Sequence, residues 1–224
     1  MNVEDYTKAG KIASEVREMA REKNWIGKTV YDICEEIEGE IRKLGAKPAF
    51  PVNTSINEVA AHYTAEPNDE LTIKENDLVK IDLGAQINGY IADTAVTVNY
   101  DPQYDNLVTA AEEALANAMS MAKVGVKASD IGRTIEKTIK QLGFKPIANL
   151  SGHSLDQYTI HAGKSIPNIW SIGTFSLSDS SAYACEPFVT TSDGLGFVRE
   201  GKIKNIYAMV TRKKTKNEEA DKLL

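Results

Sequence analysis

We expect a mixed chain of the α+β or α/β class, built from two related halves. Residues 27–48 and 125–146 align at an offset of 98 residues with ten identities in 22 positions, and such self-similarity is typical of a duplicated unit. Each copy also combines helical hydrophobic spacing with later strand-like runs. Coincidence between two helix ends is the alternative. It explains the matched isoleucines but not the matched Gly, Asp and Lys.

Each half is expected to contain two helices followed by strands. Apolar residues at helical spacing predict helices over residues 6–20, 29–44, 104–122 and 129–142. Gly45 and Gly143 should end the second helix of each pair, because glycine readily adopts the left-handed conformation that stops a helix. Strands are expected over residues 78–86, 89–100 and 181–189.

Composition narrows the class of protein. The 224 residues, 42% of them hydrophobic, suit one large domain or two fused halves. A net charge of −6 argues against a nucleic-acid partner. The sequence has no apolar run of about 18 residues, so no membrane span is expected, and its charged N-terminus does not resemble a secretion signal. Two cysteines do not suggest a disulfide framework, so a cytoplasmic location is expected.

An Asn-Gly pair at 88–89 lies between two strand-like runs, which is typical of a two-residue hairpin turn. With that turn, Asp93 opposes Gly84, and the alternation of side chains places Asp82 and Asp93 on the same face. Diagonal neighbours of this kind lie about 7–8 Å apart. Gly84 should leave room there for a bulky group.

Two carboxylates in an apolar strand pair repel each other and are costly to bury without a counter-charge. A bound divalent cation, or a pair of them, would resolve this conflict. The alternative is a solvated face with ordinary surface aspartates. The flanking apolar residues favour burial on both faces, and therefore a metal: Val79, Ile81, Leu83, Ile91, Ala95 and Val96.

The chain has three histidines, and each has a suggestive neighbourhood. His153 follows a loop of small residues at 150–152, His161 lies close to a glycine, and His62 follows another loop. Taken singly, each is more often a structural histidine than a ligand. Glu186 lies in an apolar run, where a carboxylate needs a partner.

Asp82, Asp93, His153 and Glu186 form an oxygen-rich set with one imidazole. Such a set suits Mn, Fe or Co(II) and admits Zn. The sequence lacks a CxxC pair, a GxSxG elbow, a GxxxxGK[ST] loop and an HExxH helix. Metal-activated water is therefore favoured over a serine or cysteine nucleophile.

Four segments closely resemble the archaeal and eukaryotic type 2 methionine aminopeptidases, in the order of that family: residues 47–64, 79–98, 145–168 and 184–188. The resemblance runs from near residue 5 to the end of the chain. It implies a pita-bread (creatinase/aminopeptidase) fold, in which two pseudo-symmetric αβ halves enclose a two-metal site. It places a metallopeptidase domain at 1–204, with halves of about 1–100 and 101–204.

The resemblance also implies roles for the four candidate ligands. Asp93 would bridge two divalent ions (Co, Mn, Fe or Zn), Asp82 would bind one of them, and His153 and Glu186 would bind the other.

The remaining implied roles concern the substrate and the reaction. His62 and His161 would line the substrate site, and Phe50 and Ile160 would wall the pocket for a methionine side chain. The implied reaction is removal of the initiator methionine by metal-assisted hydrolysis, with Glu186 or His161 moving protons.

A fifth ligand of the family, a second bridging glutamate, has no evident counterpart in this sequence. We expect residues 205–224 to be the start of a truncated helical insertion, with Asn217 capping a new helix and the second half incomplete. A frayed polar tail is the alternative. On this expectation the chain holds one ion well and is impaired as an enzyme.

Alternative functions remain open. These are a non-catalytic binding protein of the same fold, one part of a split enzyme, and another pita-bread hydrolase such as a proline dipeptidase. The expected partners are nascent polypeptide N-termini, with the ribosome as a further candidate, and a monomer is favoured.

Overall fold

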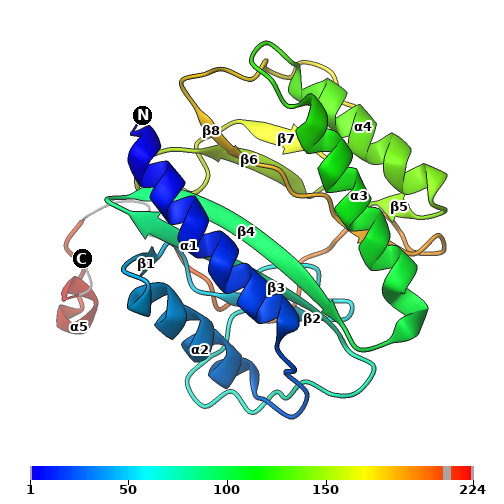
Figure 1. Ribbon diagram of the computed structural model, residues 1–224. Helices are drawn as coiled ribbons and strands as arrows, with labels where there is room; N and C mark the ends of the chain where they lie inside the picture. Colours follow the sequence, from blue (N-terminus) through cyan, green and yellow to red (C-terminus); the bar gives the residue numbers. More distant parts are fainter. Residues whose placement is uncertain (1, 209–212, 223–224) are drawn as a thin grey trace.

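A computed structural model describes residues 2–208 and 213–222 of the chain (Figure 1). The elements of the first half are α1 (Val3–Glu22), α2 (Val30–Lys43), β1 (Lys47–Pro48), β2 (Asn53–Ile56), β3 (Leu78–Ile87) and β4 (Tyr90–Asn99). Those of the second half are η1 (Pro102–Tyr104), α3 (Asp105–Met121), α4 (Ala128–Gln141), β5 (Lys145–Pro146), β6 (Ser151–Leu155), β7 (Ser165–Pro167), β8 (Ala182–Ala184) and β9 (Val189–Thr190). A last short helix, α5, covers Glu218–Asp221.

The first half is a small antiparallel sheet covered on one face by two helices. Strand β3 pairs with β1 and β2 on one side and with β4 along its whole length on the other. Helix α1 packs across β3 and β4, and both helices contribute to the core (Figure 1). The strand residues that meet the helices are buried and alternate along the chain, as expected for a sheet with one covered face: Val79, Ile81, Leu83, Val96 and Val98.

The second half has the same pair of helices over a less extensive set of strands. Helix α4 packs on α3, β5 and β7, while β6 lies between β7 and β8. Strands β5 and β9 form a separate pair. The core of this half is built mainly from isoleucines of α4, which recur at helical spacing: Ile131, Ile135 and Ile139.

The predicted duplication is confirmed, and the structure shows where its offset changes. Helices α2 and α4, and strands β2 and β6, begin 98 residues apart. Beyond β6 the equivalent pairings lie 104 residues apart, since Ser55 pairs with Lys80 in one half and His153 pairs with Ala184 in the other. The isolated bridges Thr29↔Thr72 and Lys127↔Ser176 show the same shift. Six additional residues therefore follow β6 in the second half.

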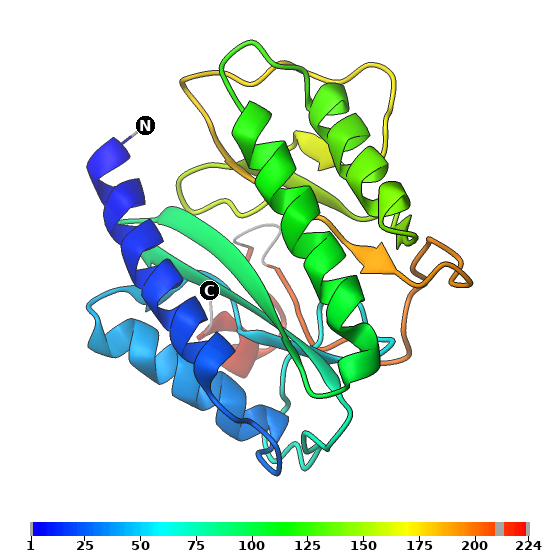
Figure 2. The same ribbon diagram turned by 45° about the vertical axis from the view of Figure 1, so that its right-hand side comes forward.

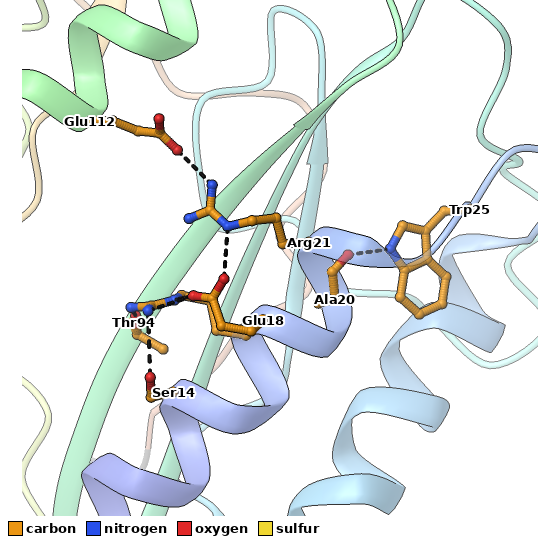
Figure 3. A network of polar contacts seen from close by, with 8 residues as sticks. Ser14, Glu18, Ala20, Arg21, Trp25, Thr94 and Glu112 are labelled. Carbon is orange, nitrogen blue, oxygen red and sulfur yellow. Dashed lines mark hydrogen bonds and ion pairs between the residues drawn. The ribbon is translucent and has the colours of Figure 1, made fainter.

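Polar contacts connect the halves along α1 (Figure 3). Arg21 donates to Glu18 on its own helix and, over 2.6 Å, to Glu112 on α3. Arg17 donates to Thr94 on β4 at 3.0 Å, a contact within the first half. Figure 2 shows α1 and α3 flanking the long hairpin of β3 and β4, so the contact of Arg21 with Glu112 helps to fix the two halves around it.

The four predicted helices are confirmed within two or three residues, and Gly45 and Gly143 adopt the expected left-handed conformation at φ 89° and 86°. The Asn-Gly hairpin turn is also confirmed, with Asn88 at φ 51° and Gly89 at φ 86°. Asn217 caps α5 as expected, accepting from the backbone of Glu219 and Ala220.

Two expectations about the strands are wrong. The single strand expected over 181–189 is two short strands, β8 and β9, separated by residues 185–188. The face of the hairpin that bears the aspartates is only partly buried, because Ala95 is exposed there whereas Ile91 is 4% exposed. The helices cover only the opposite face. No helix within residues 2–208 and 213–222 is long and apolar enough to cross a membrane.

Candidate metal centre

Asp82 and Asp93 come from adjacent strands of the first half. Asp82 pairs with Ala95, and Asp93 pairs with Gly84, so the two carboxylates share the face opposite the helices, as the turn predicted. The side chain of Asp93 is only 9% exposed. Oδ1 of Asp82 is buried and has no hydrogen-bond partner among the described residues.

His153 and Glu186 reach the same place from the second half. His153 Nε2 lies 3.3 Å from Asp93 Oδ2 and 3.0 Å from Glu186 Oε1. One ligand atom from each of these three residues lies within 4.8 Å of the others. Asp82 stands outside this tight group, close enough to Asp93 and Glu186 for their charges to act on it.

Local backbone structure explains how the second half brings its ligands together. His153 is on β6 and not after a loop, because residues 151 and 152 belong to the same strand. Gly152 lets β6 approach the segment before Glu186. A Cβ at that position would collide with the carbonyl oxygen of Ala184 and lie 3.0 Å from Cα of Cys185. Glu186 lies in the gap between β8 and β9, where the strand is interrupted.

The electrostatics of the cluster are those of a site that requires a cation. Burial raises the pKa of Asp82 well above its usual range, and the neighbouring charges of Asp93 and Glu186 raise it further. Burial alone would lower the pKa of His153, but its contacts with the carboxylates of Asp93 and Glu186 raise it to about 10. Three carboxylates thus crowd around a single imidazole.

The donor set fits a divalent cation. Asp82 Oδ1 and His153 Nδ1 are buried without a hydrogen-bond partner in the described part of the chain, and the buried Glu186 Oε1 has only its 3.0 Å contact with His153 Nε2. Such unsatisfied buried atoms are costly, and a cation would remove the cost for the oxygens. Carboxylate oxygens with one imidazole suit Mn, Fe, Co or Zn better than a soft metal.

The other two histidines, His161 and His62, lie near the cluster. The ring of His161 is 4.4 Å from that of His153, in an edge-to-face arrangement. The pKa of His161 is lowered by burial, then by His153 and, to a smaller extent, by His62. His62 adopts a left-handed backbone conformation at φ 64°, which is uncommon outside glycine.

Phe50 and Ile160 border the cluster from opposite halves. The room at Gly84 is taken by the ring of Phe50, which a Cβ there would strike. Ile160 packs with Ile91 and the other apolar residues of a small cluster between the halves, which contains Ala49, Leu155, Ala182 and Ala184. The structure therefore groups Asp93, His153 and Glu186 tightly, with Asp82 and His161 beside them. His62 lies close enough to His161 for its charge to act on that residue.

Sequence reasoning missed one relation among these residues. With the offset of 104 residues, Glu186 occupies the position of Asp82 in the duplicated unit. The offset of 98 residues hides this equivalence, because it aligns Asp82 with Ser180. It also missed Gly152, for which a glycine just before a candidate ligand was the available signal.

This fold and this cluster define a divalent-cation site between two related αβ halves. The sequence model of metallopeptidase family M24 matches residues 4–208 of this chain. The chain belongs to that family, has its pita-bread fold and carries the donor set for the divalent metal that the family uses.

Known relatives carry a more specific name. The chain is similar to a methionine aminopeptidase of Pyrococcus abyssi, with 51% identity over 87% of this chain and 66% of that protein. It is 43% identical to a methionine aminopeptidase of Methanocaldococcus jannaschii, over 100% of this chain and 76% of that protein. The crystal structure of methionine aminopeptidase from Thermotoga maritima matches with a TM-score of 0.75 and 30% identity, covering 84% of this chain and 79% of that chain. The chain thus spans about two thirds of the length of the first of these relatives.

Proposed function

We propose that this protein removes the N-terminal methionine from nascent polypeptides by metal-dependent hydrolysis. The observation that carries the proposal is the convergence of Asp93, His153 and Glu186 from two halves onto one point, with contacts of 3.0 and 3.3 Å. The names of the relatives support methionine as the residue removed.

The proposed cofactor is one or two divalent ions, of Co, Mn, Fe or Zn. Asp93, His153 and Glu186 would hold one ion, and Asp82 with Asp93 would supply oxygen ligands for a second. A bound ion of this kind activates water and polarises a peptide carbonyl. Because the first group has more protein ligands, we expect it to bind its ion more tightly.

The other residues of the site would bind substrate and move protons. Phe50 and Ile160 offer apolar surface from either half beside the cluster, which suits an unbranched thioether side chain and disfavours a charged one. His161 has a lowered pKa and is therefore uncharged at neutral pH, so it can accept a proton or a hydrogen bond from the substrate amide. Glu186 would share that work and His62 would line the same space, which the contact of Glu186 with His153 and the charge effect of His62 on His161 support.

Hydrolysis of the tripeptide Met-Ala-Ser tests the proposal. The purified protein should cleave it with Mn(II) or Co(II) and lose the activity in EDTA. Lys-Ala-Ser should resist cleavage, because a charged side chain does not suit an apolar pocket. Cleavage of an Xaa-Pro dipeptide but not of Met-Ala-Ser would instead indicate a proline dipeptidase. Tight cation binding without any cleavage would indicate a non-catalytic protein of the same fold.

A further inference from the structure

A contact between the halves lies outside the metal cluster, at the tip of the β3–β4 hairpin. We define the imidazole loop as residues 156–164, which connect β6 to β7 and carry Ile160 and His161. The region after β6 is where the second half has more residues than the first. The additional residues of this region therefore have no equivalent in the first half.

The imidazole loop is fixed at its base by its own half. Ser154 N donates to Lys164 O at 2.9 Å, and Ala162 N donates to Ser154 O at 2.8 Å. A tight turn at the far end is closed by reciprocal backbone hydrogen bonds between Asp156 and Thr159, of 2.9 and 3.0 Å. His161 lies between the base and this turn, so a movement of either would displace it.

The far turn is attached to the first half through two residues. Tyr158 N donates to the carbonyl of Gly89 at 2.8 Å, and Gln157 Nε2 donates to the carbonyl of Asn88 at 2.8 Å. The Tyr158 ring lies against Gly89, where a Cβ would come within 2.5 to 2.7 Å of it. Only glycine at the hairpin tip leaves space for this ring.

The contact also carries backbone strain. Tyr158 adopts φ 56°, in the left-handed region that aromatic residues rarely occupy. Strain of this kind persists only where surrounding contacts hold it, and it is frequent near functional sites. Asn88 is itself tied to α1, since its side chain donates to Asp5 at 3.1 Å. The hairpin tip is thus anchored to α1 and is not a free end.

We propose that Gln157 and Tyr158 are positioning residues, which lock the imidazole loop onto the hairpin tip and so hold His161 and Ile160 beside ligands from the other half. The role in catalysis rests on the function proposed above. Neither residue need touch substrate or metal. Tyr158 is 73% exposed, with its ring against Gly89 on the surface.

The test compares Tyr158→Asn with Tyr158→Phe in the chain of residues 1–224. Asn accepts the left-handed conformation more readily than Tyr, so this change removes the ring without adding backbone strain. Phe keeps the ring that lies against Gly89. We expect kcat for Met-Ala-Ser to fall roughly tenfold to a hundredfold in the Asn variant, the range that a small misplacement of catalytic groups produces. We expect it to stay within about twofold in the Phe variant, with Mn(II) affinity little changed in both.

A second readout does not need enzymatic activity. The chain has three histidines, so its imidazole NMR signals can be assigned one by one. Tyr158→Asn should shift or broaden the His161 signals and leave those of His62 unchanged, and Tyr158→Phe should restore them. If the wild-type protein does not cleave Met-Ala-Ser, the proposed function fails while the NMR comparison still decides the positioning role.

Gln157→Ala provides an independent variant with the ring intact, and Gln141→Ala, at the exposed end of α4, is its matched control. Gln157→Ala should shift the His161 signals in the same direction, whereas Gln141→Ala should not. If Tyr158→Asn does not fold, the comparison of Gln157→Ala with Gln141→Ala decides whether the contact positions His161. Wild-type His161 signals and wild-type kcat in folded Tyr158→Asn, or in folded Gln157→Ala, would overturn the proposal.

Discussion

The two halves have the same helices but different sheets. Helices α2 and α4 correspond at a constant offset, and each ends at a left-handed glycine. Strand β3 runs unbroken for ten residues and has partners on both sides, whereas its counterpart is divided into β8 and β9. Within the described ranges, β8 and β9 pair on one side only.

This difference shows how a duplicated scaffold forms an asymmetric site. Asp82 and Glu186 occupy equivalent positions, yet Asp82 is fixed within a regular strand while Glu186 lies in an interruption. The interruption lets Glu186 approach His153 at 3.0 Å. Asp82 remains outside the tight group of three. We therefore expect the two equivalent carboxylates to contribute unequally to cation binding.

Neutralising each of the two carboxylates tests this inequality and should give the largest effect. Glu186→Gln should weaken Mn(II) binding by at least about a hundredfold, because it removes a charged ligand from the tight group. Asp82→Asn should weaken the tighter site by less. Titration calorimetry measures both, with Glu35→Gln, on the exposed face of α2, as the control. Equal losses from the two variants would contradict the assignment of unequal roles.

Alanine substitutions at Gly84 and Gly39 compare a tightly packed glycine with an exposed one in the first half. Gly84→Ala should destabilise the fold by about 1–3 kcal/mol, because its methyl group would collide with the Phe50 ring. Gly39 is exposed within α2, and a methyl group added there would meet open space, with no atom outside its own helix within 4 Å. Gly39→Ala should therefore stabilise the fold, by roughly 0.5–1 kcal/mol. Urea denaturation measures both changes, and a harmless Gly84→Ala would argue against a tightly packed Phe50.

Amide hydrogen exchange compares the sheets directly. Amides in β8 and β9 should exchange at least about tenfold faster than those in the middle of β3, since strands paired on both sides open less often. The measurement is exchange followed by NMR on the full chain. Equal protection in the two regions would mean that the sheets are equally stable despite their different pairing.

The pH dependence of stability should report the charge balance of the metal-free cluster. Without metal, His153 has a folded pKa of about 10, above its ordinary value of 6.5. Its contribution to the free energy of unfolding is therefore complete below pH 6.5 and is lost as the pH rises towards 10. Thermal denaturation in EDTA should show this decline, and His153→Asn should flatten it. An unchanged slope in the variant would assign the decline to other groups.

Much of the helical scaffold and of the hairpin could be predicted from sequence, because their signals are local. Helical spacing located α1 to α4, and the Asn-Gly turn fixed the register that places Asp82 and Asp93 on one face. The division of the strand around Glu186 could not be predicted, since residues 181–189 have the composition of one continuous strand. What interrupts it is a tertiary arrangement, the pairing of β8 with β6 and of β9 with β5.

The exposure of Ala95 was also beyond local signals. Apolar residues occur on both faces of the hairpin, but only one face meets the helices. The other face bears Asp82 and Asp93 and meets residues of the second half, such as His153. Interactions between residues so distant in sequence leave no periodic pattern in either segment.

Anomalous X-ray diffraction from crystals grown with Mn(II) would locate the bound cation. We expect a manganese peak between the halves, within bonding distance of Asp93, His153 and Glu186, with any second peak on the side of Asp82 and Asp93. A structure with these side chains turned away from one another, or with manganese bound only elsewhere, would contradict this expectation.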